Sequence, residues 1–320
     1  MPDLFAISPL SQAMRDALAP HFTVCHIADM HDPVAWLDTN GTGIRHALTD
    51  GHLGLRPEFL DRLPDLELIS SFGVGYDGID TSAVTARGVI VTHTPDVLND
   101  EVATTAMLLF LSCYRNWEAE LRHARRGIWA TRGNLPLSRS ADNRHVGILG
   151  LGRIGMQTAR RLQAFGAEIS YHTRTPRDVP YRYCDDLRTM AGDVDALISI
   201  VPGGAATRHI IDAAVLDALG PEGVLVNVGR GSSVDETALI AALNENRLGW
   251  AGLDVYDDEP QIPAGLRDHP RTILAPHVGS ATVETRAAMG KLTCDNLIHH
   301  LTGQPLLTPI AESRHLLPPA

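Results

Sequence analysis

The sequence predicts an α/β protein built from two doubly wound parallel sheets. Two blocks of short apolar runs alternate with helix-like segments, and a glycine-rich turn follows the first apolar run of the second block. Strands that alternate with helices form parallel sheets with helices on both faces. A chain of 320 residues accommodates two domains, since one domain takes roughly 100–200 residues.

The first block contains its candidate strands before residue 99. Helix-like segments at residues 11–18 and 57–63 lie between them, which suits the crossover connections of parallel strands. The candidate strands cover residues 4–8, 22–27, 44–48, 66–71 and 89–92.

A long apolar helix is expected from Asn99, which can cap it. Its apolar positions lie on most sides, as is typical of a buried helix, and a second helix follows to about residue 126. The second block of strands then begins, and a last helix is expected at residues 283–301. Two β-α-β-α-β halves, the architecture of a dinucleotide-binding domain, accommodate this order. The candidate strands cover residues 146–149, 168–172, 196–200, 224–228, 251–255 and 272–274.

Composition narrows the class of protein. Apolar residues make up 44% of the chain and charged residues 20%, which argues against long disorder. The net charge of −11 disfavours a nucleic-acid partner, because such binders are more often basic. No apolar stretch approaches 18 residues and no signal peptide is recognisable, so we expect no membrane association. The four cysteines are scattered without a CxxC pair, which favours reduced thiols and a cytoplasmic location; we expect no bound metal.

The glycine-rich turn has the sequence Gly-Leu-Gly-Arg-Ile-Gly at residues 150–155. Gly150 permits a tight turn, Gly152 lets the backbone approach a pyrophosphate, and Gly155 lets helix and strand pack closely. Arg153 and Ile154 open the helix, whose N-terminus offers free N–H groups and a positive dipole end to a phosphate. The sequence therefore predicts a dinucleotide site here; the alternative is a turn that binds no ligand.

The segment after the second strand of this block indicates which dinucleotide is bound. An NAD enzyme usually carries Asp or Glu here to bind the ribose 2′-hydroxyl, but residues 172–175 contain neither. Arg174 could instead pair with a 2′-phosphate, and Thr173 and Thr175, beside His172, could add hydroxyl contacts. We therefore expect NADP(H) to be preferred over NAD(H), unless Arg174 is an exposed and uninvolved side chain.

Three chemically useful side chains follow three successive strands of the second block. Arg230 can anchor a carboxylate and polarise a carbonyl, and His277 can donate a proton near neutral pH. Glu259 can bind the second ring nitrogen of His277 and favour the protonated imidazole. Carboxyl ends of parallel strands meet at one edge, so we expect a catalytic set. A surface arginine, a solvated acidic loop and a capping histidine are the alternatives.

Several segments together resemble the D-isomer-specific 2-hydroxyacid dehydrogenases, most closely the glyoxylate/hydroxypyruvate reductase branch. In that family the matching Arg230, Glu259 and His277 are catalytic, and Arg230 and His277 also contact the substrate. The segments that carry the resemblance are residues 150–155, 201–207, 227–231 with Val234, Asp235 and Glu236, 252–260 and 276–282.

The resemblance also implies the domain organisation. It implies a flavodoxin-like substrate domain and a Rossmann cofactor domain around a cleft, with the substrate domain made from both chain ends. The expected bounds are residues 1–98 plus 288–320 for the substrate domain and 99–287 for the cofactor domain. It further implies a homodimer formed mainly through the cofactor domains.

Further ligand contacts follow from the same resemblance. The family's aspartate on the nicotinamide amide matches Asp254. The loop Ser-Phe-Gly-Val-Gly-Tyr-Asp at residues 71–77 resembles the family's substrate-carboxylate loop, with Val74 and Gly75 supplying backbone N–H groups, unless its glycines serve geometry alone. Leu53, in a second loop, could contact the substrate. The remaining expected cofactor contacts are His172, Val201, Pro202, Thr207, Val228, Gly229 and Gly279.

These observations predict an NADP(H)-dependent oxidoreductase that interconverts a small 2-keto acid and its D-2-hydroxy acid. Glyoxylate and hydroxypyruvate are the expected substrates, and 2-ketogluconate and aryl pyruvates are alternatives. A different class remains open, a non-catalytic protein that senses a dinucleotide.

Overall fold

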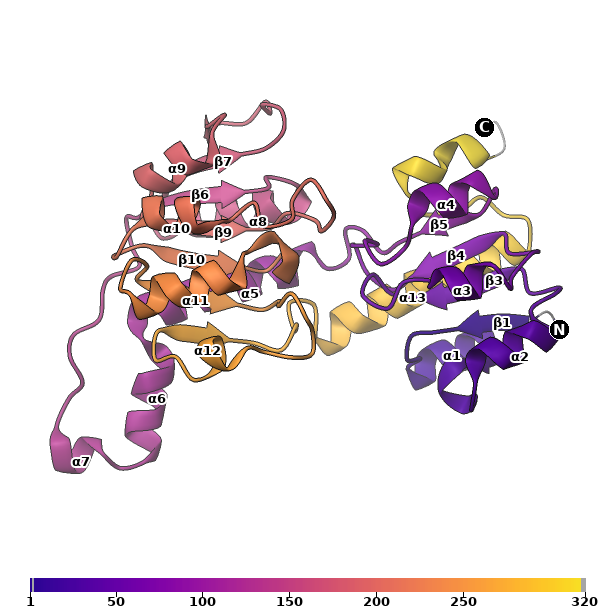
Figure 1. Ribbon diagram of the computed structural model, residues 1–320, viewed down its shortest axis with the longest axis horizontal. Helices are drawn as coiled ribbons and strands as arrows, with labels where there is room; N and C mark the ends of the chain where they lie inside the picture. The colour runs from indigo at the N-terminus through magenta and orange to yellow at the C-terminus, as the bar shows by residue number, and fades with distance from the viewer. Residues whose placement is uncertain (2, 318–320) are drawn as a thin grey trace. The chain divides into compact units, whose positions relative to one another are not determined.

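Two wholly parallel sheets organise the chain in the computed structural model, which describes residue 1 and residues 3–317 (Figure 1). One sheet has five strands and the other has seven among the described residues. The five-stranded sheet belongs to unit 1, which comprises Met1–Leu98 and Ala281–Ala320, and the other belongs to unit 2, Asn99–Ser280. The predicted fold class, two doubly wound parallel sheets, is confirmed.

Unit 1 has the strand order β2-β1-β3-β4-β5, which is the flavodoxin-like order with its switch point between β1 and β3. Ser11 caps the first helix by accepting the Met14 amide, and Asp32 caps the second, which Pro33 begins. The elements are β1 (Asp3–Ala6), α1 (Gln12–Leu18), β2 (Thr23–His26), η1 (Ile27–Asp29), α2 (Pro33–Asn40), β3 (His46–Thr49), α3 (Pro57–Leu60), β4 (Leu68–Ser71), α4 (Thr81–Ala86), β5 (Ile90–Thr92), α13 (Val283–Leu301) and η3 (Ala311–Leu316).

Unit 2 has the strand order β12-β11-β10-β9-β6-β7-β8, with the switch point between β6 and β9. The elements are α5 (Asn99–Arg115), α6 (Trp117–Arg125), α7 (Trp129–Arg132), β6 (His145–Leu149), α8 (Arg153–Gln163), β7 (Glu168–His172), β8 (Arg182–Tyr183), α9 (Leu187–Asp193), β9 (Ala196–Ser199), α10 (Ala213–Leu219), β10 (Val224–Asn227), η2 (Gly231–Ser233), α11 (Glu236–Asn244), β11 (Trp250–Leu253), α12 (Ala264–Arg267) and β12 (Thr272–Leu274).

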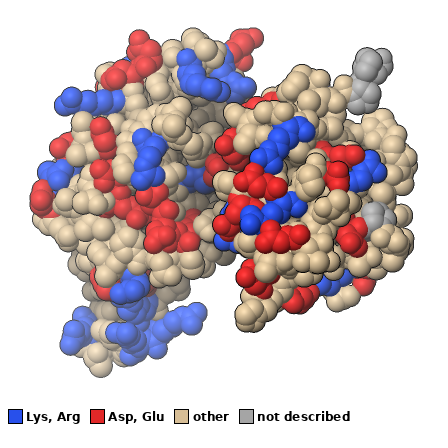
Figure 2. Space-filling view, turned by 45° about the vertical axis from the view of Figure 1, so that its right-hand side comes forward, with Lys and Arg blue, Asp and Glu red and all other residues tan. Residues whose placement is uncertain are grey.

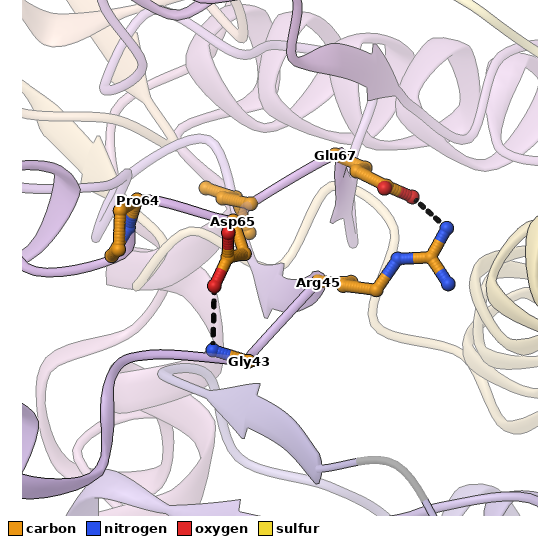
Figure 3. Close-up of a pocket in the computed structure, with 6 residues that line it drawn as sticks. Gly43, Arg45, Pro64, Asp65 and Glu67 are labelled. Atoms are coloured by element: carbon orange, nitrogen blue, oxygen red, sulfur yellow. Dashed lines mark hydrogen bonds and ion pairs between the residues drawn. The ribbon is translucent and has the colours of Figure 1, made fainter.

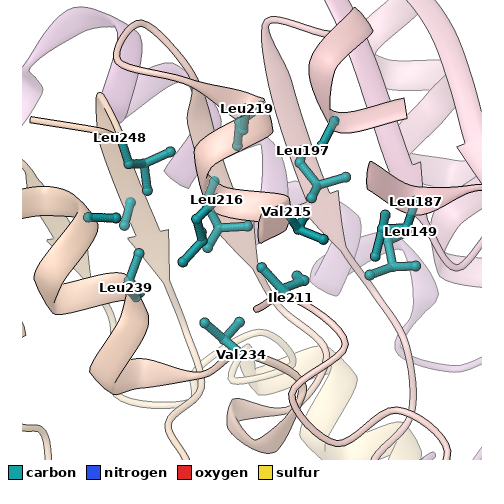
Figure 4. Close-up of a cluster of buried hydrophobic side chains, with 14 of the residues drawn as sticks. Leu149, Leu187, Leu197, Ile211, Val215, Leu216, Leu219, Val234, Leu239 and Leu248 are labelled. Carbon is teal, nitrogen blue, oxygen red and sulfur yellow. The ribbon is translucent and has the colours of Figure 1, made fainter. Parts of the chain in front are cut away.

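The core of unit 2 explains why its strands are almost wholly apolar. Leu197 of β9, Leu216 of α10 and Leu239 of α11 are fully buried and point toward one another (Figure 4). Burying one such side chain stabilises the fold by about 1.5–3 kcal/mol. On the other face, α5 is buried along most of its length, as predicted, and Gly252 of β11 lets it approach, since a Cβ there would lie 3.0 Å from the Leu109 Cβ.

Several boundaries differ from the sequence-based expectation. The helix expected at residues 57–63 ends at Leu60. The two-residue strand β8 carries too short a pattern to be predicted. Unit 1 resumes at Ala281, whereas the expected bound was residue 288, and α13 packs against α1 and β4.

A cavity of about 390 Å³ lies in unit 1, at the amino ends of β3 and β4. Its polar groups are paired within the wall: Asp65 accepts the Gly43 amide at 2.8 Å, and Arg45 forms an ion pair with Glu67 at 2.5 Å (Figure 3). Doubly wound sheets bind ligands at the carboxyl ends of their strands. A functional site is therefore expected at the opposite, carboxyl ends of the strands.

Candidate active site

The predicted catalytic side chains follow three adjacent strands of unit 2. Strands β10, β11 and β12 are neighbours in the sheet, and their carboxyl ends lead into the loops that carry Arg230, Glu259 and His277. The parallel register pairs Asn227 of β10 with Leu253 of β11, so the two strands end level with each other. This arrangement brings the loops to one edge.

Glu259 and His277 are directly hydrogen-bonded. The Glu259 Oε2 lies 2.6 Å from the His277 Nδ1, and the Glu259 Oε1 accepts the backbone N–H of Tyr256 at 3.0 Å. The imidazole side chain is 44% exposed whereas the carboxylate is 15% exposed. A carboxylate that holds Nδ1–H fixes the tautomer, which leaves Nε2 as the nitrogen that can exchange a proton with a ligand.

Asp254 holds the backbone turn that presents His277. Its two carboxylate oxygens accept the amides of Val278 at 2.7 Å and Gly279 at 2.8 Å, and its carbonyl accepts the His277 amide at 2.8 Å. These bonds maintain His277 in a left-handed conformation with φ 52°. Burial raises the pKa of Asp254, and the two amides oppose that rise. The predicted contact of Asp254 with a nicotinamide amide stays a prediction.

The loop that carries Arg230 is organised by Asn227, to which we assigned no role from the sequence. The Asn227 side chain accepts the Gly229 amide at 3.1 Å and donates to the Arg230 carbonyl at 2.8 Å. Gly231 packs against the next loop, since a Cβ there would lie 1.8 Å from the Tyr256 carbonyl carbon. An Asn followed two residues later by Gly after a strand is a turn signal that could have revealed this role.

The glycine turn has the geometry that the sequence pattern predicts. Gly150 has φ +96°, and a Cβ on Gly155 would lie 2.4 Å from the Gly150 carbonyl oxygen, so both positions require glycine. A Cβ on Gly152, by contrast, would meet nothing within 4 Å. Gly152 is also the N-cap of α8 and gives it no side-chain cap. Open space in front of a helix N-terminus that has no side-chain cap fits a pyrophosphate. Arg153 and Ile154 lie in the first turn of this helix.

The segment after β7 presents an exposed arginine. Arg174 is exposed and has no carboxylate partner among the described residues, while the Thr173 hydroxyl donates to the Thr175 carbonyl at 2.7 Å. His172 binds the Cys184 carbonyl through Nδ1 at 2.9 Å. Sequence reasoning overlooked Arg177, whose guanidinium donates to the Leu151 carbonyl and so ties this segment to the glycine turn.

The other predicted cofactor residues flank the switch point of unit 2. A Cβ on Gly229 would lie 2.6 Å from the Val201 carbonyl oxygen, so the loops after β9 and β10 are in backbone contact. The Val228 amide donates to the Ser199 carbonyl at 3.1 Å. The Thr207 hydroxyl donates to the Pro202 carbonyl at 2.7 Å and closes the loop after β9. The structure thus gathers Val201, Pro202, Val228 and Gly229 around neighbouring strand ends.

The predicted substrate loops lie in unit 1, after β3 and β4. A Cβ on Gly51 would lie 2.1 Å from the Gly75 carbonyl oxygen, so the two loops pack backbone to backbone. The Val74 carbonyl accepts from His93 at 2.9 Å, whereas the Val74 and Gly75 amides have no acceptor among the described residues. Leu53 is 45% exposed. Two amides without an acceptor on a glycine loop suit an anion.

The described residues provide neither a membrane-spanning helix nor a cluster of metal ligands. None of the helices in that part of the chain combines the length and apolar character that crossing a membrane needs. No group of three or more His, Cys, Asp or Glu side chains there is arranged to hold a metal ion.

Known proteins resemble this chain over nearly its whole length. The model for the D-isomer specific 2-hydroxyacid dehydrogenase, NAD binding domain, matches residues 107–279. The glyoxylate/hydroxypyruvate reductase A of Arabidopsis thaliana is 41% identical over 94% of this chain and 96% of the relative, and the 2-ketogluconate reductase of Gluconobacter oxydans is 39% identical over 97% and 98%. The crystal structure of the NADPH-dependent glyoxylate/hydroxypyruvate reductase of Sinorhizobium meliloti is 43% identical, with a TM-score of 0.92 over 98% of both chains. The chain therefore belongs to the D-isomer specific 2-hydroxyacid dehydrogenase family, as its sequence motifs predict.

Proposed function

We propose that this protein is an NADP(H)-dependent reductase that converts a small 2-keto acid into its D-2-hydroxy acid and catalyses the reverse oxidation. The hydrogen-bonded pair of Glu259 and His277 carries the proposal, because reducing a ketone requires a proton donor. Glyoxylate or hydroxypyruvate is the proposed substrate, as in the relatives from Arabidopsis thaliana and Sinorhizobium meliloti.

Each side chain has a distinct part in the proposed reaction. When bound, the reduced nicotinamide supplies the hydride that the carbonyl carbon accepts. His277 gives the proton from Nε2 to the carbonyl oxygen, and Glu259 stabilises the imidazolium before that transfer. Arg230 binds the carboxylate of the keto acid and polarises its carbonyl. One hydride and one proton enter, so the product is the hydroxy acid.

Unit 2 is the proposed cofactor domain and unit 1 the proposed substrate domain. The glycine turn at residues 150–155 and Asp254 support the first assignment. The amides of Val74 and Gly75 and the exposed Leu53 support the assignment of unit 1 as the substrate domain. The amides would bind the carboxylate of the keto acid, and Leu53 would contact its short side chain.

The preference for NADP(H) rests on Arg174. Its guanidinium could pair with a 2′-phosphate, and charge-assisted bonds of this kind contribute about 1.5–3 kcal/mol. Arg174→Ala should therefore lower the ratio of kcat/KM for NADPH to that for NADH about 10- to 100-fold. Arg160→Ala, an exposed arginine of α8, serves as the control and should leave the ratio unchanged. A wild-type preference for NADH would disprove the assignment.

A panel of 2-keto acids with NADPH tests the reaction itself. The proposal expects the highest kcat/KM for glyoxylate or hydroxypyruvate. A preference for 2-ketogluconate or an aryl pyruvate would keep the reaction and correct the substrate. Tight NADPH binding without turnover of any 2-keto acid would contradict the proposed function and favour a dinucleotide sensor.

We also propose a cytoplasmic homodimer that forms through unit 2. Large apolar side chains are exposed on α5, α6, α7 and the segment that follows, and basic side chains also gather on the arm formed by α6 and α7 (Figure 2). Exposed apolar surface of this kind marks protein interfaces. The molar mass in solution, measured by light scattering, should be twice that of the chain. The exposed apolar residues on these segments of unit 2 are Leu108, Trp117, Leu121, Trp129 and Leu137.

A further inference from the structure

Glu236 belongs to a sequence motif that the proposed mechanism does not use. It is the first residue of α11 and is half-buried. Its Oε1 accepts the backbone N–H of Asp257 at 3.0 Å. Asp257 lies two residues before Glu259, so the contact joins a helix of the core to the loop that carries the partner of His277.

The same loop is tethered at neighbouring positions as well. The Tyr256 amide donates to the Glu259 Oε1 at 3.0 Å, and the Arg208 guanidinium lies 3.3 Å from the Asp257 carboxylate. Arg208 is 55% exposed, so this ion pair contributes little. The hydrogen bond from the Asp257 amide to Glu236 is thus firmer than the ion pair between the Asp257 side chain and Arg208.

A carboxylate at position 236 carries an electrostatic cost. Burial raises the pKa of Glu236, and the neighbouring carboxylates of Asp257, Asp258 and Glu259 raise it further, against the lowering effect of the Asp257 amide. Like charges at short range disfavour ionisation. The hydrogen-bond acceptor, and not the charge, is therefore the favourable feature of this side chain, because the charge is repelled by all three neighbours.

We propose that Glu236 is a positioning residue, which fixes the Asp257 amide and thereby holds Glu259 at hydrogen-bonding distance from His277. The inference rests on the proposed reductase function and deepens it. The positioning role depends on the acceptor oxygen and on the length of the side chain that carries it, and it does not depend on the negative charge. Since general acid catalysis depends on a held geometry, loosening this contact should slow proton transfer more than it weakens binding.

Two substitutions separate the effect of side-chain length from the effect of charge. Glu236→Gln keeps the length and an acceptor oxygen without the charge, and Glu236→Asp keeps the charge but withdraws the oxygen by one methylene. We expect kcat within twofold of wild type for Glu236→Gln and about tenfold lower for Glu236→Asp. In Glu236→Asp, KM and the NADPH dissociation constant should stay within twofold, and the pH profile of kcat should narrow on its alkaline side.

Asp258→Asn is the matched control. Asp258 is exposed and lies in the same loop, and its substitution removes one negative charge without removing any side-chain hydrogen bond among the described residues. We expect wild-type kcat and an unchanged pH profile. Thermal unfolding of all variants identifies any loss of activity that merely follows a loss of stability.

Several results would overturn the proposal. A wild-type kcat for Glu236→Asp would show that the contact is dispensable, and equal losses in Glu236→Gln and Asp258→Asn would assign the effect to charge. If the wild-type protein reduces no 2-keto acid, the proposed function fails while the inference can still be tested. In that case the ring-proton chemical shifts of His277, assigned with a His277→Ala variant, provide the test. They should differ from wild type in Glu236→Asp and match wild type in Glu236→Gln. Shifts that change in Glu236→Gln but not in Glu236→Asp would refute the positioning role.

Discussion

Two histidines of this molecule are hydrogen-bonded through the ring, but they differ in their partners and in their exposure to solvent. His277 in unit 2 is half-exposed and is bonded to the Glu259 carboxylate at 2.6 Å. His46 in unit 1 is 1% exposed, and its Nε2 lies 2.9 Å from the Nδ1 of a second imidazole, His300. An imidazolium is stabilised beside a carboxylate but not beside another imidazole in a dry interior.

The hydrogen bonds of the buried pair explain why it resists protonation. The His46 Nδ1 is buried without a partner among the described residues, so the neutral ring should carry its proton on Nε2 and donate to His300. Protonating His300 on Nδ1 would reverse that bond and leave a buried N–H on His46 without an acceptor. Such an orphan group costs about 1–3 kcal/mol. The difference between the two histidines therefore lies in their partners and their access to solvent.

The largest expected effect comes from the exposed pair. His277→Ala should lower kcat by roughly 10²–10⁴-fold, because it removes the proposed general acid, and should change KM much less. Steady-state kinetics with NADPH and glyoxylate measure both constants. His31→Ala, which alters an exposed histidine of unit 1, is the control. A near-normal kcat for His277→Ala would remove this side chain from the mechanism.

The buried pair should affect stability instead. Burial, together with the smaller effects of His300 and Arg45 and against the opposing effect of Glu67, lowers the pKa of His46 from 6.5 to about 4. The folded state then binds fewer protons than the unfolded state between these values, so the stability present above pH 6.5 is lost as pH falls toward 4. The difference between the pKa values of His46 in the unfolded and the folded state corresponds to about 3 kcal/mol of unfolding free energy.

Urea unfolding between pH 7.5 and 4.5 measures this loss. A double variant, His46→Leu with His300→Leu, should show a shallower decline, because replacing both partners by apolar groups leaves nothing to protonate. The control His31→Gln should follow wild type. Parallel declines in the double variant and wild type would show that the pair does not cause the acid sensitivity.

Glu259→Gln should have the smallest effect of the three. The glutamine oxygen can still accept the Tyr256 amide, but the charge beside His277 is lost. We expect kcat to fall about tenfold, since a charge-assisted bond is roughly twice as strong as a neutral one. Comparing the variant with Asp258→Asn separates this contact from the general charge of the loop. No change in kcat would show that the imidazole works without its carboxylate partner.

Much of the site could be predicted because its side chains and glycines are chemically distinctive. Gly150 and Gly155 are required by backbone contacts that the G-x-G-x-x-G pattern itself encodes. Arg230, Glu259 and His277 each follow a recognisable strand, and parallel strands place their carboxyl ends at one edge. The alternation of strands and helices likewise determined the fold class, since crossover helices must cover both faces of such sheets.

Other contacts were decided only by the tertiary structure. The contact of Glu236 with Asp257 and the bond between Arg177 and Leu151 join residues about 20 positions apart or more, and no local pattern encodes such pairs. The sequence by itself determined the fold class, the kinds of chemistry that follow the strands and the pairing of Glu259 with His277. The remaining partners, from the Glu236 carboxylate beside the Asp257 amide to the second imidazole beside His46, were decided by packing, because burial and hydrogen bonding depend on contacts between distant segments.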